Sequence, residues 1–196
     1  MQPRIYLAGP ARKNEHKRHE DLKAQCLAVG MVAVSPNDAP TAGTIADAQM
    51  IRDRNLGLIQ SCDAVLADLL AFRGPSADCG CVYECGYASA LNKPVVAYHV
   101  WQDYTYRDKV HVIITRDNAA YNTLGLGQAA GFKRDRDVIE DFGLFDKLML
   151  AAGLQSTHET QEDAILALAT LFSSHDPSKD ESELRFLMLR AQKHFL

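Results

Sequence analysis

The sequence predicts an α/β protein with a doubly wound, mostly parallel sheet of about five strands flanked by helices. Strand and helix patterns alternate through the first hundred residues. The predicted strands are continuous apolar runs, so they need cover on both faces, which is typical of parallel sheets. Ligands bind such sheets outside the carboxyl ends of the strands. The loops that follow the first three strands carry polar residues, and we expect the site there.

The individual elements follow from apolar runs that turn residues separate. Gly9-Pro10 closes the first run, Gly30 stops the first helix, and residues 92–94 end the third helix. Short apolar runs predict buried strands at residues 4–8, 31–34, 63–69 and 95–99. Helical spacing and helix-ending residues predict helices at residues 14–29, 45–61, 78–91 and 141–152. This order of elements is that of flavodoxin-like and Rossmann-like folds.

The last part of the chain is less regular. Residues 101–137 mix aromatic residues, charges and glycines, which fits a partly mobile segment or an oligomer contact. Thr160 is predicted to cap a further helix. Apolar residues at helical spacing predict a final amphipathic helix that carries Leu184, Leu187, Met188 and Ala191. We divide the chain into a catalytic domain, residues 1–155, and a helical extension, residues 156–196, that packs on the same domain or on a partner subunit.

Composition and charge argue against several classes of protein. The net charge of −4 and the pI of about 5.9 give no basis for nucleic-acid binding, which usually shows as a basic surface. No stretch approaches the ~18 apolar residues of a membrane span, and the N-terminus lacks a signal-peptide layout. The five cysteines, an odd number, fit a reducing compartment better than a disulfide framework. We therefore expect a cytoplasmic protein.

Two motifs raise the question of a metal or a cofactor. Cys79, Cys81 and Cys85 lie close together, but no CxxC pair or paired histidines accompany them, which favours buried thiols over a zinc site. Residues 125–130 loosely match a Gly-x-Gly-x-x-Ala dinucleotide fingerprint, but they do not follow the first strand of a βαβ unit. We therefore expect neither a metal nor a cofactor.

Two acids, Asp78 and Glu84, lie six residues apart at the start of the helix that follows the third strand. A carboxylate near a helix N-terminus is stabilised as the anion, which is the form a nucleophile needs. Gly80 and Gly86 keep the backbone clear around Glu84, so that a ligand can approach it. From the spacing alone, both acids are explained equally well as residues that favour a helix start.

Several segments follow one another in a distinctive order between residues 4 and 150. They are Tyr6-Leu-Ala-Gly9-Pro10, Arg52-x-x-Asn55, Asp63-Ala-Val-Leu-Ala-Asp68, Phe72-Arg-Gly-Pro-Ser-Ala-Asp78, Glu84-Cys-Gly-Tyr-Ala88, Asn92-Lys-Pro94, Phe142-Gly-Leu and Leu148-Met149-Leu150. In order and spacing, these segments resemble the nucleoside 2-deoxyribosyltransferase family. The acid-Gly-Tyr-Ala segment with its upstream Asp is the most specific of them.

The resemblance implies a double displacement, as in retaining glycosidases. Glu84 would attack the anomeric carbon of a 2′-deoxynucleoside, and a free nucleobase would capture the deoxyribosyl-enzyme in a nucleoside salvage reaction. Tyr6 would hydrogen-bond Glu84, although a strand-end Tyr taken alone is more often a packing residue. Asp78 would bind the sugar 5′-hydroxyl, and its charge would favour nucleosides over nucleotides because a carboxylate repels a phosphate.

Asn55 matches the family position that contacts the nucleobase, whereas taken alone it can instead satisfy backbone groups. Asp68, at the end of the third strand, can support the site or simply cap a helix or loop. The remaining predicted substrate-binding residues are Gly9, Lys147 and Met149. The resemblance also implies a homo-oligomer, a dimer or a hexamer, with active sites shared between subunits.

Two departures from the family pattern add positive charge near the predicted site. Lys147 replaces an Asn that usually reaches the sugar from a neighbouring subunit, and Arg12-Lys13 replaces an aromatic residue near the base. They keep open an alternative, a nucleoside 5′-monophosphate N-glycosidase that uses the same Glu84 with water, its phosphate bound by Arg12 or Lys147. A second alternative is a non-catalytic nucleoside- or nucleotide-binding module on the same fold.

Overall fold

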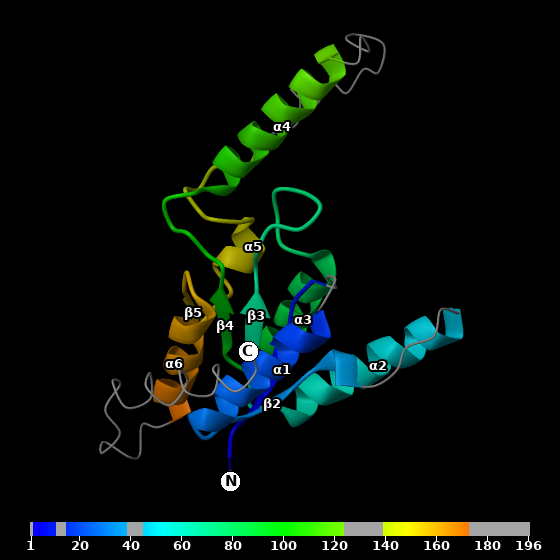
Figure 1. The fold of residues 1–196 in the computed structure, drawn as a ribbon, viewed down its shortest axis with the longest axis vertical. Helices are drawn as coiled ribbons and strands as arrows, with labels where there is room; N and C mark the ends of the chain where they lie inside the picture. The colour runs from blue at the N-terminus through cyan, green and yellow to red at the C-terminus, as the bar shows by residue number, and fades with distance from the viewer. Residues whose placement is uncertain (1, 11–14, 39–44, 124–138, 173–196) are drawn as a thin grey trace.

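The computed structural model of the chain describes residues 2–10, 15–38, 45–123 and 139–172. At its centre lies a parallel sheet with the strand order β2-β1-β3-β4-β5 (Figure 1). The strands are β1 (Arg4–Ala8), β2 (Val32–Val34), β3 (Ala64–Asp68), β4 (Val95–Tyr98) and β5 (Ser156–Thr157). The prediction of a doubly wound, parallel five-stranded sheet is confirmed.

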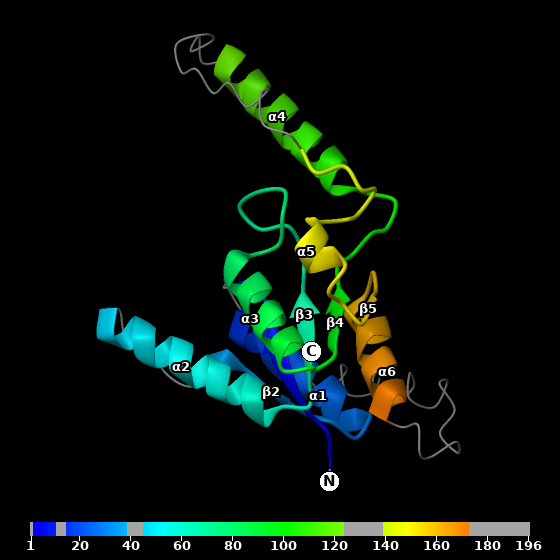
Figure 2. The same ribbon diagram turned by 180° about the vertical axis from the view of Figure 1, so that it is seen from behind.

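Helices cover both faces of this sheet. One face packs against α1 (Glu15–Ala28) and α6 (Gln161–Phe172). The other face packs against α2 (Ile45–Ser61), α3 (Cys79–Ala90) and the short α5 (Leu148–Ala151). A 3-10 turn, η1 (Pro36–Asp38), follows β2, and α4 (Tyr106–Thr123) projects away from the sheet, as both views show (Figures 1 and 2).

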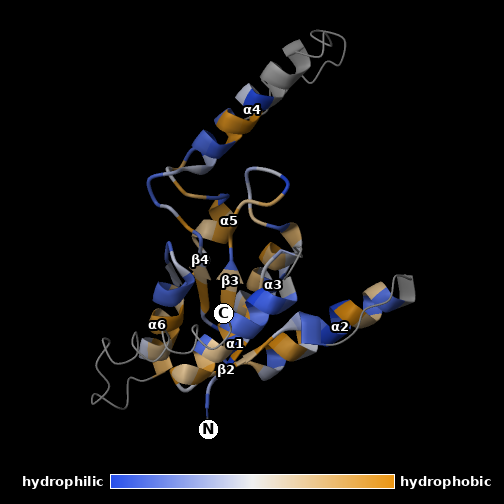
Figure 3. Ribbon diagram, in the orientation of Figure 1, coloured by the Kyte–Doolittle hydropathy of each residue, from blue (hydrophilic) through white to orange (hydrophobic). Residues whose placement is uncertain are grey.

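Alternate side chains of the strands enter two separate cores. From β1, Ile5 and Leu7 pack on the α1 and α6 side, whereas Tyr6 and Ala8 pack on the α2 and α3 side. All four side chains are buried, and each full burial of a large apolar side chain contributes roughly 1.5–3 kcal/mol. Figure 3 shows hydrophobic residues in the central strands and hydrophilic residues along much of α1. The continuous apolar runs in the sequence therefore arise from strands covered on both faces.

The helix predicted at residues 141–152 is wrong over its first part, because α5 is restricted to Leu148–Ala151. Gly143 adopts a positive φ of 68°, a left-handed conformation that interrupts a helix. The buried carboxylate of Asp146 accepts a hydrogen bond from the backbone of Ala77 at 2.9 Å, which draws residues 144–147 onto the loop before α3. A tertiary contact therefore overrides the local helical pattern.

Two elements were not assigned from the sequence. α4 forms the first half of the irregular stretch at residues 101–137, and β5 has only two residues, which pair with Val96 and Ala97 of β4. β5 and α6 belong to the same sheet and core as the residues before them. The domain division at residue 155 stays a prediction.

The N-cap predicted at Thr160 is confirmed. Its hydroxyl oxygen accepts a hydrogen bond from the backbone nitrogen of Asp163 at 3.1 Å and donates one to the Asp163 carboxylate. The final amphipathic helix, the Arg12-Lys13 pair and the glycine fingerprint lie outside the described residues. Among the helices described, none has the length and apolar character needed to cross a membrane.

Candidate active site

The candidate site lies beside the point where the strand order reverses. β1 is paired with β2 on one side and with β3 on the other, so the chain winds in opposite directions from this strand pair. Such a reversal opens a crevice at the carboxyl ends of the strands, where ligands of doubly wound sheets bind. Three predicted residues come together here from different elements: Tyr6 from β1, Asn55 from α2 and Glu84 from α3.

Tyr6 and Glu84 form the central contact of the site. The Tyr6 hydroxyl donates a hydrogen bond to Oε1 of Glu84 at 2.6 Å, across 78 residues of sequence. Tyr6 is fully buried, and this burial, together with the neighbouring Glu84 carboxylate, raises the pKa of the phenol far above its ordinary value of 10. Tyr6 therefore remains a protonated donor at any physiological pH and orients the carboxylate.

Asn55 also hydrogen-bonds Glu84, and this contact lowers the pKa of the carboxyl group. A contact that favours the anion means that the amide donates to the carboxylate. The Asn55 amide oxygen accepts from the Arg54 guanidinium at 3.4 Å, an arrangement that leaves the amide nitrogen for Glu84. Asn55 can thus orient a carboxylate and a ligand, but an amide supplies no acidic proton.

The pKa of Glu84 is raised to about 7 from its ordinary value of 4.5. Burial is the largest cause, since it penalises the charged form, and the nearby charge of Asp78 adds to the increase. Hydrogen bonds from Tyr6 and Asn55 oppose the increase. The carboxylate is therefore a stronger base and nucleophile than an exposed glutamate, and it is substantially ionised only from neutral pH upward.

Asp78 has one of the two roles that the sequence left open, that of a helix cap, and its contact with a sugar 5′-hydroxyl stays a prediction. Its Oδ1 caps α3 by accepting from the backbone nitrogens of Gly80 at 3.0 Å and Cys81 at 3.2 Å. A Cβ on Gly80 would lie 3.0 Å from this oxygen, so glycine leaves room for the cap. Oδ2 accepts no hydrogen bond from the described part of the chain, and the charge of Asp78 acts on Glu84. Glu84 lies in the second turn of α3 and is not itself a cap.

Asp68 does not join this group. Its side chain points to the opposite face of the sheet, where it pairs with Arg18 of α1 and accepts from Nδ1 of His99 at 2.7 Å. Burial alone would raise the pKa of Asp68, but the contacts with His99 and Arg18 hold it at about 2. A structural ion-pair network accounts for these contacts, and a substrate-binding role for Asp68 stays a prediction.

The other predicted residues lie at the rim. Gly9 directly follows β1, at the carboxyl edge of the sheet. The Lys147 ammonium lies 5.8 Å from the centre of the Tyr106 ring, and Met149 is 87% exposed. The structure does not bring Lys147 or Met149 into contact with Glu84 within the chain, so their binding roles stay predictions.

Two sets of contacts that hold this region together were missed by sequence reasoning. The first set joins Asp68 to its two partners, Arg18 and His99. The second joins the buried Asp146 to Ser76 and Ala77. Each contact spans between 31 and 70 residues of sequence. No local signal announces such partners, because the contacts exist only once the sheet has formed.

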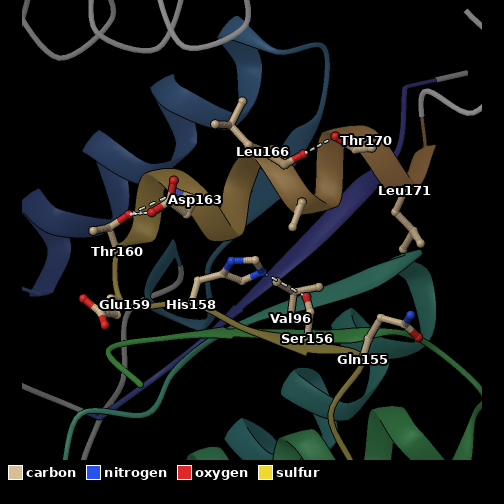
Figure 4. Close-up of a pocket in the computed structure, with 11 residues that line it drawn as sticks. Val96, Gln155, Ser156, His158, Glu159, Thr160, Asp163, Leu166, Thr170 and Leu171 are labelled. Atoms are coloured by element: carbon tan, nitrogen blue, oxygen red, sulfur yellow. Dashed lines mark hydrogen bonds between the residues drawn. The ribbon is translucent and has the colours of Figure 1, made fainter. Parts of the chain in front are cut away.

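Glu84 belongs neither to a metal centre nor to the pocket beside α6. The described residues contain no group of three or more His, Cys, Asp or Glu side chains able to hold a metal ion. A pocket of about 590 Å³ lies between α6 and β5, lined by residues such as His158, Thr160 and Leu171 (Figure 4). α6 covers the face of the sheet opposite α3, so this pocket is separate from the site.

Comparison with known proteins identifies the family. The family model for nucleoside 2-deoxyribosyltransferase matches residues 5–149, nearly the whole sheet and every residue of the candidate site. The chain belongs to the nucleoside 2-deoxyribosyltransferase family. Its members are enzymes of the transferase class, so Glu84 and the residues around it are the active-site candidate of a transferase.

Solved structures agree with this assignment. A 2-desoxiribosyltransferase from Leishmania mexicana is 27% identical with a TM-score of 0.61, over 88% of this chain and 99% of that one. A conserved protein from Enterococcus faecalis V583 is 18% identical with a TM-score of 0.53, over 84% of this chain and 96% of that one, which shows the fold alone. No match was found among curated protein sequences.

Proposed function

We propose that the protein transfers 2-deoxyribose between nucleobases by double displacement, through a covalent deoxyribosyl intermediate on Glu84. One observation carries this proposal: a largely buried carboxylate, with its pKa raised to about 7, is held by a Tyr6 hydroxyl that lies 2.6 Å away. A carboxylate that only stabilised the fold would not need an orienting donor at the ligand-binding edge of the sheet.

In the first step, a carboxylate oxygen of Glu84 attacks the anomeric carbon of a 2′-deoxynucleoside. The bond between that carbon and the base nitrogen breaks, and its electron pair leaves with the base. In the second step, a nitrogen of another nucleobase attacks the same carbon and releases the carboxylate, so two inversions give overall retention. Tyr6 keeps the carboxylate in line, Asp78 accepts from the sugar 5′-hydroxyl, and Asn55 orients the base.

The hydrolase alternative uses the same Glu84 with water as the acceptor. One observation weighs against a 5′-phosphate: Asp78, whose charge is close enough to raise the pKa of Glu84, would face that phosphate. The hydrolase alternative needs a cation to bind the 5′-phosphate, and of its two candidates only Lys147 lies in the described part of the chain. The Lys147 ammonium lies over the ring of Tyr106. Family membership also argues against a purely binding module.

The deciding experiment is base exchange. The protein is incubated with 2′-deoxyinosine and free adenine, and separately with dCMP or dGMP alone, and the products are separated by chromatography. Deoxyadenosine formed by the wild type and not by a Glu84→Gln variant supports the transferase. Free base and deoxyribose phosphate released from the nucleotide, with no exchange, would establish the hydrolase instead.

A Tyr6→Phe substitution should reduce kcat/KM by roughly 10- to 100-fold, the value of one hydrogen bond to a charged group. It should also change the pH profile, because the lost donor stabilises the ionised carboxylate. The pKa of Glu84 then rises further, and the acidic limb of kcat/KM moves to higher pH. Steady-state rates across the neutral pH range measure this shift. A rate loss at an unchanged pH profile would contradict the orienting role of Tyr6.

We also propose a homo-oligomer, a dimer or a hexamer, with sites shared between subunits. Large apolar side chains are exposed on both sides of Lys147: Phe142 is 65% exposed and Met149 is 87% exposed. Light scattering should give a mass above that of one chain, and Met149→Glu should shift it toward the monomer. Leu27→Glu, at an exposed position of α1, is the matched control and should leave the mass unchanged. A monomeric wild type would contradict the proposal.

A role in nucleoside salvage in the cytoplasm completes the proposal. Base exchange on free nucleosides is a recycling reaction, since it makes a new nucleoside without new sugar synthesis. All five cysteines are free thiols and four of them are buried, which suits a reducing compartment.

A further inference from the structure

Asp146 is a buried carboxylate with an unusually complete set of donors. It is 2% exposed. Its Oδ1 accepts from the Ser76 hydroxyl and from the backbone nitrogen of Lys147 at 2.7 Å, and its Oδ2 accepts from the backbone nitrogen of Ala77 at 2.9 Å. Burial of a charge is costly unless hydrogen bonds compensate it, so these three contacts fix the carboxylate in one position.

On one side, these contacts hold the loop that presents Asp78. Ser76 and Ala77 are the two residues directly before Asp78, and the loop closes on itself where the nitrogen of Phe72 donates to the carbonyl of Ser76 at 3.1 Å. Asp78 then caps α3, the helix that carries Glu84. The position of Asp78 relative to Glu84 is therefore anchored from a residue almost 70 positions away in the sequence.

On the other side, Asp146 holds the segment that leads into α5 and the base of α4. The Lys109 ammonium donates to the carbonyl of Phe145 at 2.7 Å, and the backbone nitrogen of Tyr106 donates to the carbonyl of Leu144 at 2.8 Å. Burial lowers the pKa of Lys109, and the charge of Asp146 opposes that decrease. Asp146 thus joins the loop before α3 to the rim that carries Lys147.

We propose that Asp146 is a positioning residue that keeps Asp78 at the active site and thereby sets the enzyme's preference for a sugar with a free 5′-hydroxyl. This inference rests on the proposed function, because it acts through the contact of Asp78 with that hydroxyl. A buried acid that served stability alone would affect all substrates equally, whereas Asp146 affects those that Asp78 recognises.

Asparagine is the informative replacement. The amide oxygen of an Asp146→Asn side chain can still accept from Ser76 and Lys147, but its NH₂ group then faces the N–H of Ala77, so two donors oppose each other. The hydrogen bond from Ala77, the residue next to Asp78, is therefore lost, while those from Ser76 and Lys147 are kept. A hydrogen bond to a charged group corresponds to roughly 10- to 100-fold in affinity, so the 5′-hydroxyl preference should decrease by about tenfold, mainly through KM.

The test compares 2′-deoxyinosine with 2′,5′-dideoxyinosine, each with adenine as acceptor, and measures kcat and KM. The variants are Asp146→Asn, Asp78→Asn and the double variant, with Asp163→Asn on α6 as the matched control. We expect Asp146→Asn to lose preference for the 5′-hydroxyl and to have no further effect in the Asp78→Asn background. The control should keep the wild-type preference.

Equal losses on both substrates, or effects that multiply in the double variant, would overturn the inference. If Asp146→Asn does not fold, as judged by circular dichroism, Ser76→Ala replaces it, since that change removes one donor and leaves the two backbone donors in place.

The behaviour of the wild type distinguishes failure of this inference from failure of the proposed function. If it hydrolyses without exchange, the proposed transfer fails, but release of free base still measures the 5′-hydroxyl preference. A wild type that does neither overturns both.

Discussion

Replacement of Glu84 by glutamine is expected to lower base exchange by roughly three to six orders of magnitude, as for the loss of other enzymatic nucleophiles. The amide keeps the shape of the side chain, and its oxygen can still accept from the Tyr6 hydroxyl. It cannot form the proposed covalent ester with the sugar. Acid quenching followed by intact-mass measurement should show a deoxyribosyl adduct on the wild type and none on the variant. Residual exchange at more than a few per cent would show that another group is the nucleophile.

The same substitution should stabilise the fold at high pH. Because the pKa of Glu84 is about 7 in the folded protein and 4.5 ordinarily, the folded state binds this proton more tightly. The stability that the protonated group contributes is present below about pH 4.5 and is lost as the pH rises through 7. Glutamine has no such loss, so Glu84→Gln should exceed the wild type by roughly 1–3 kcal/mol at about pH 8.

Urea unfolding at about pH 5 and about pH 8 checks this difference. The two proteins should have similar free energies of unfolding at the lower pH and should diverge at the higher one. A variant that is destabilised equally at both values would show that the Glu84 carboxylate is not strained by its burial.

Among the substitutions considered for stability, removal of the Asp68 carboxylate should lower the free energy of unfolding the most. Asp68→Ala leaves Arg18 and His99 without their shared acceptor, and the loss of one partner from a buried ion pair costs about 3–5 kcal/mol. Asp68→Asn should cost less, because the amide oxygen still accepts one of these hydrogen bonds. Urea unfolding near neutral pH measures the loss, and Asp141→Asn, in an exposed pair with Arg107, should change stability by less than about 1 kcal/mol.

The Asp68 contribution should also depend on pH. Its pKa is about 2 in the folded protein and 3.8 ordinarily, so the stability it provides is present above about pH 4 and is lost as the pH falls toward 2. The difference between the wild type and Asp68→Asn should therefore narrow in acid. A difference that stays constant down to pH 2 would contradict a contribution from the charge.

Local patterns account for most of the fold. β1 at Arg4–Ala8 and α2 at Ile45–Ser61 have the bounds expected from the sequence, because apolar runs and helix-ending residues act on their own neighbourhood. The family resemblance carried by the motifs around Tyr6, Asn55 and Glu84 also implied that these residues meet at one site. A parallel sheet places its strand ends at one edge, so order along the chain translates into proximity.

Tertiary structure alone decided the rest. Residues 141–147 remain a loop because Asp146 finds its partners almost 70 residues away, and β5 is too short to show any period. Asp68 faces away from Glu84 although β3, which it ends, reaches the same edge of the sheet as β1, which carries Tyr6. A strand buried on both faces has no apolar alternation to reveal which side chain points where. Only the packing of α1 against one face and α3 against the other makes Asp68 a structural ion-pair partner and Glu84 a candidate nucleophile.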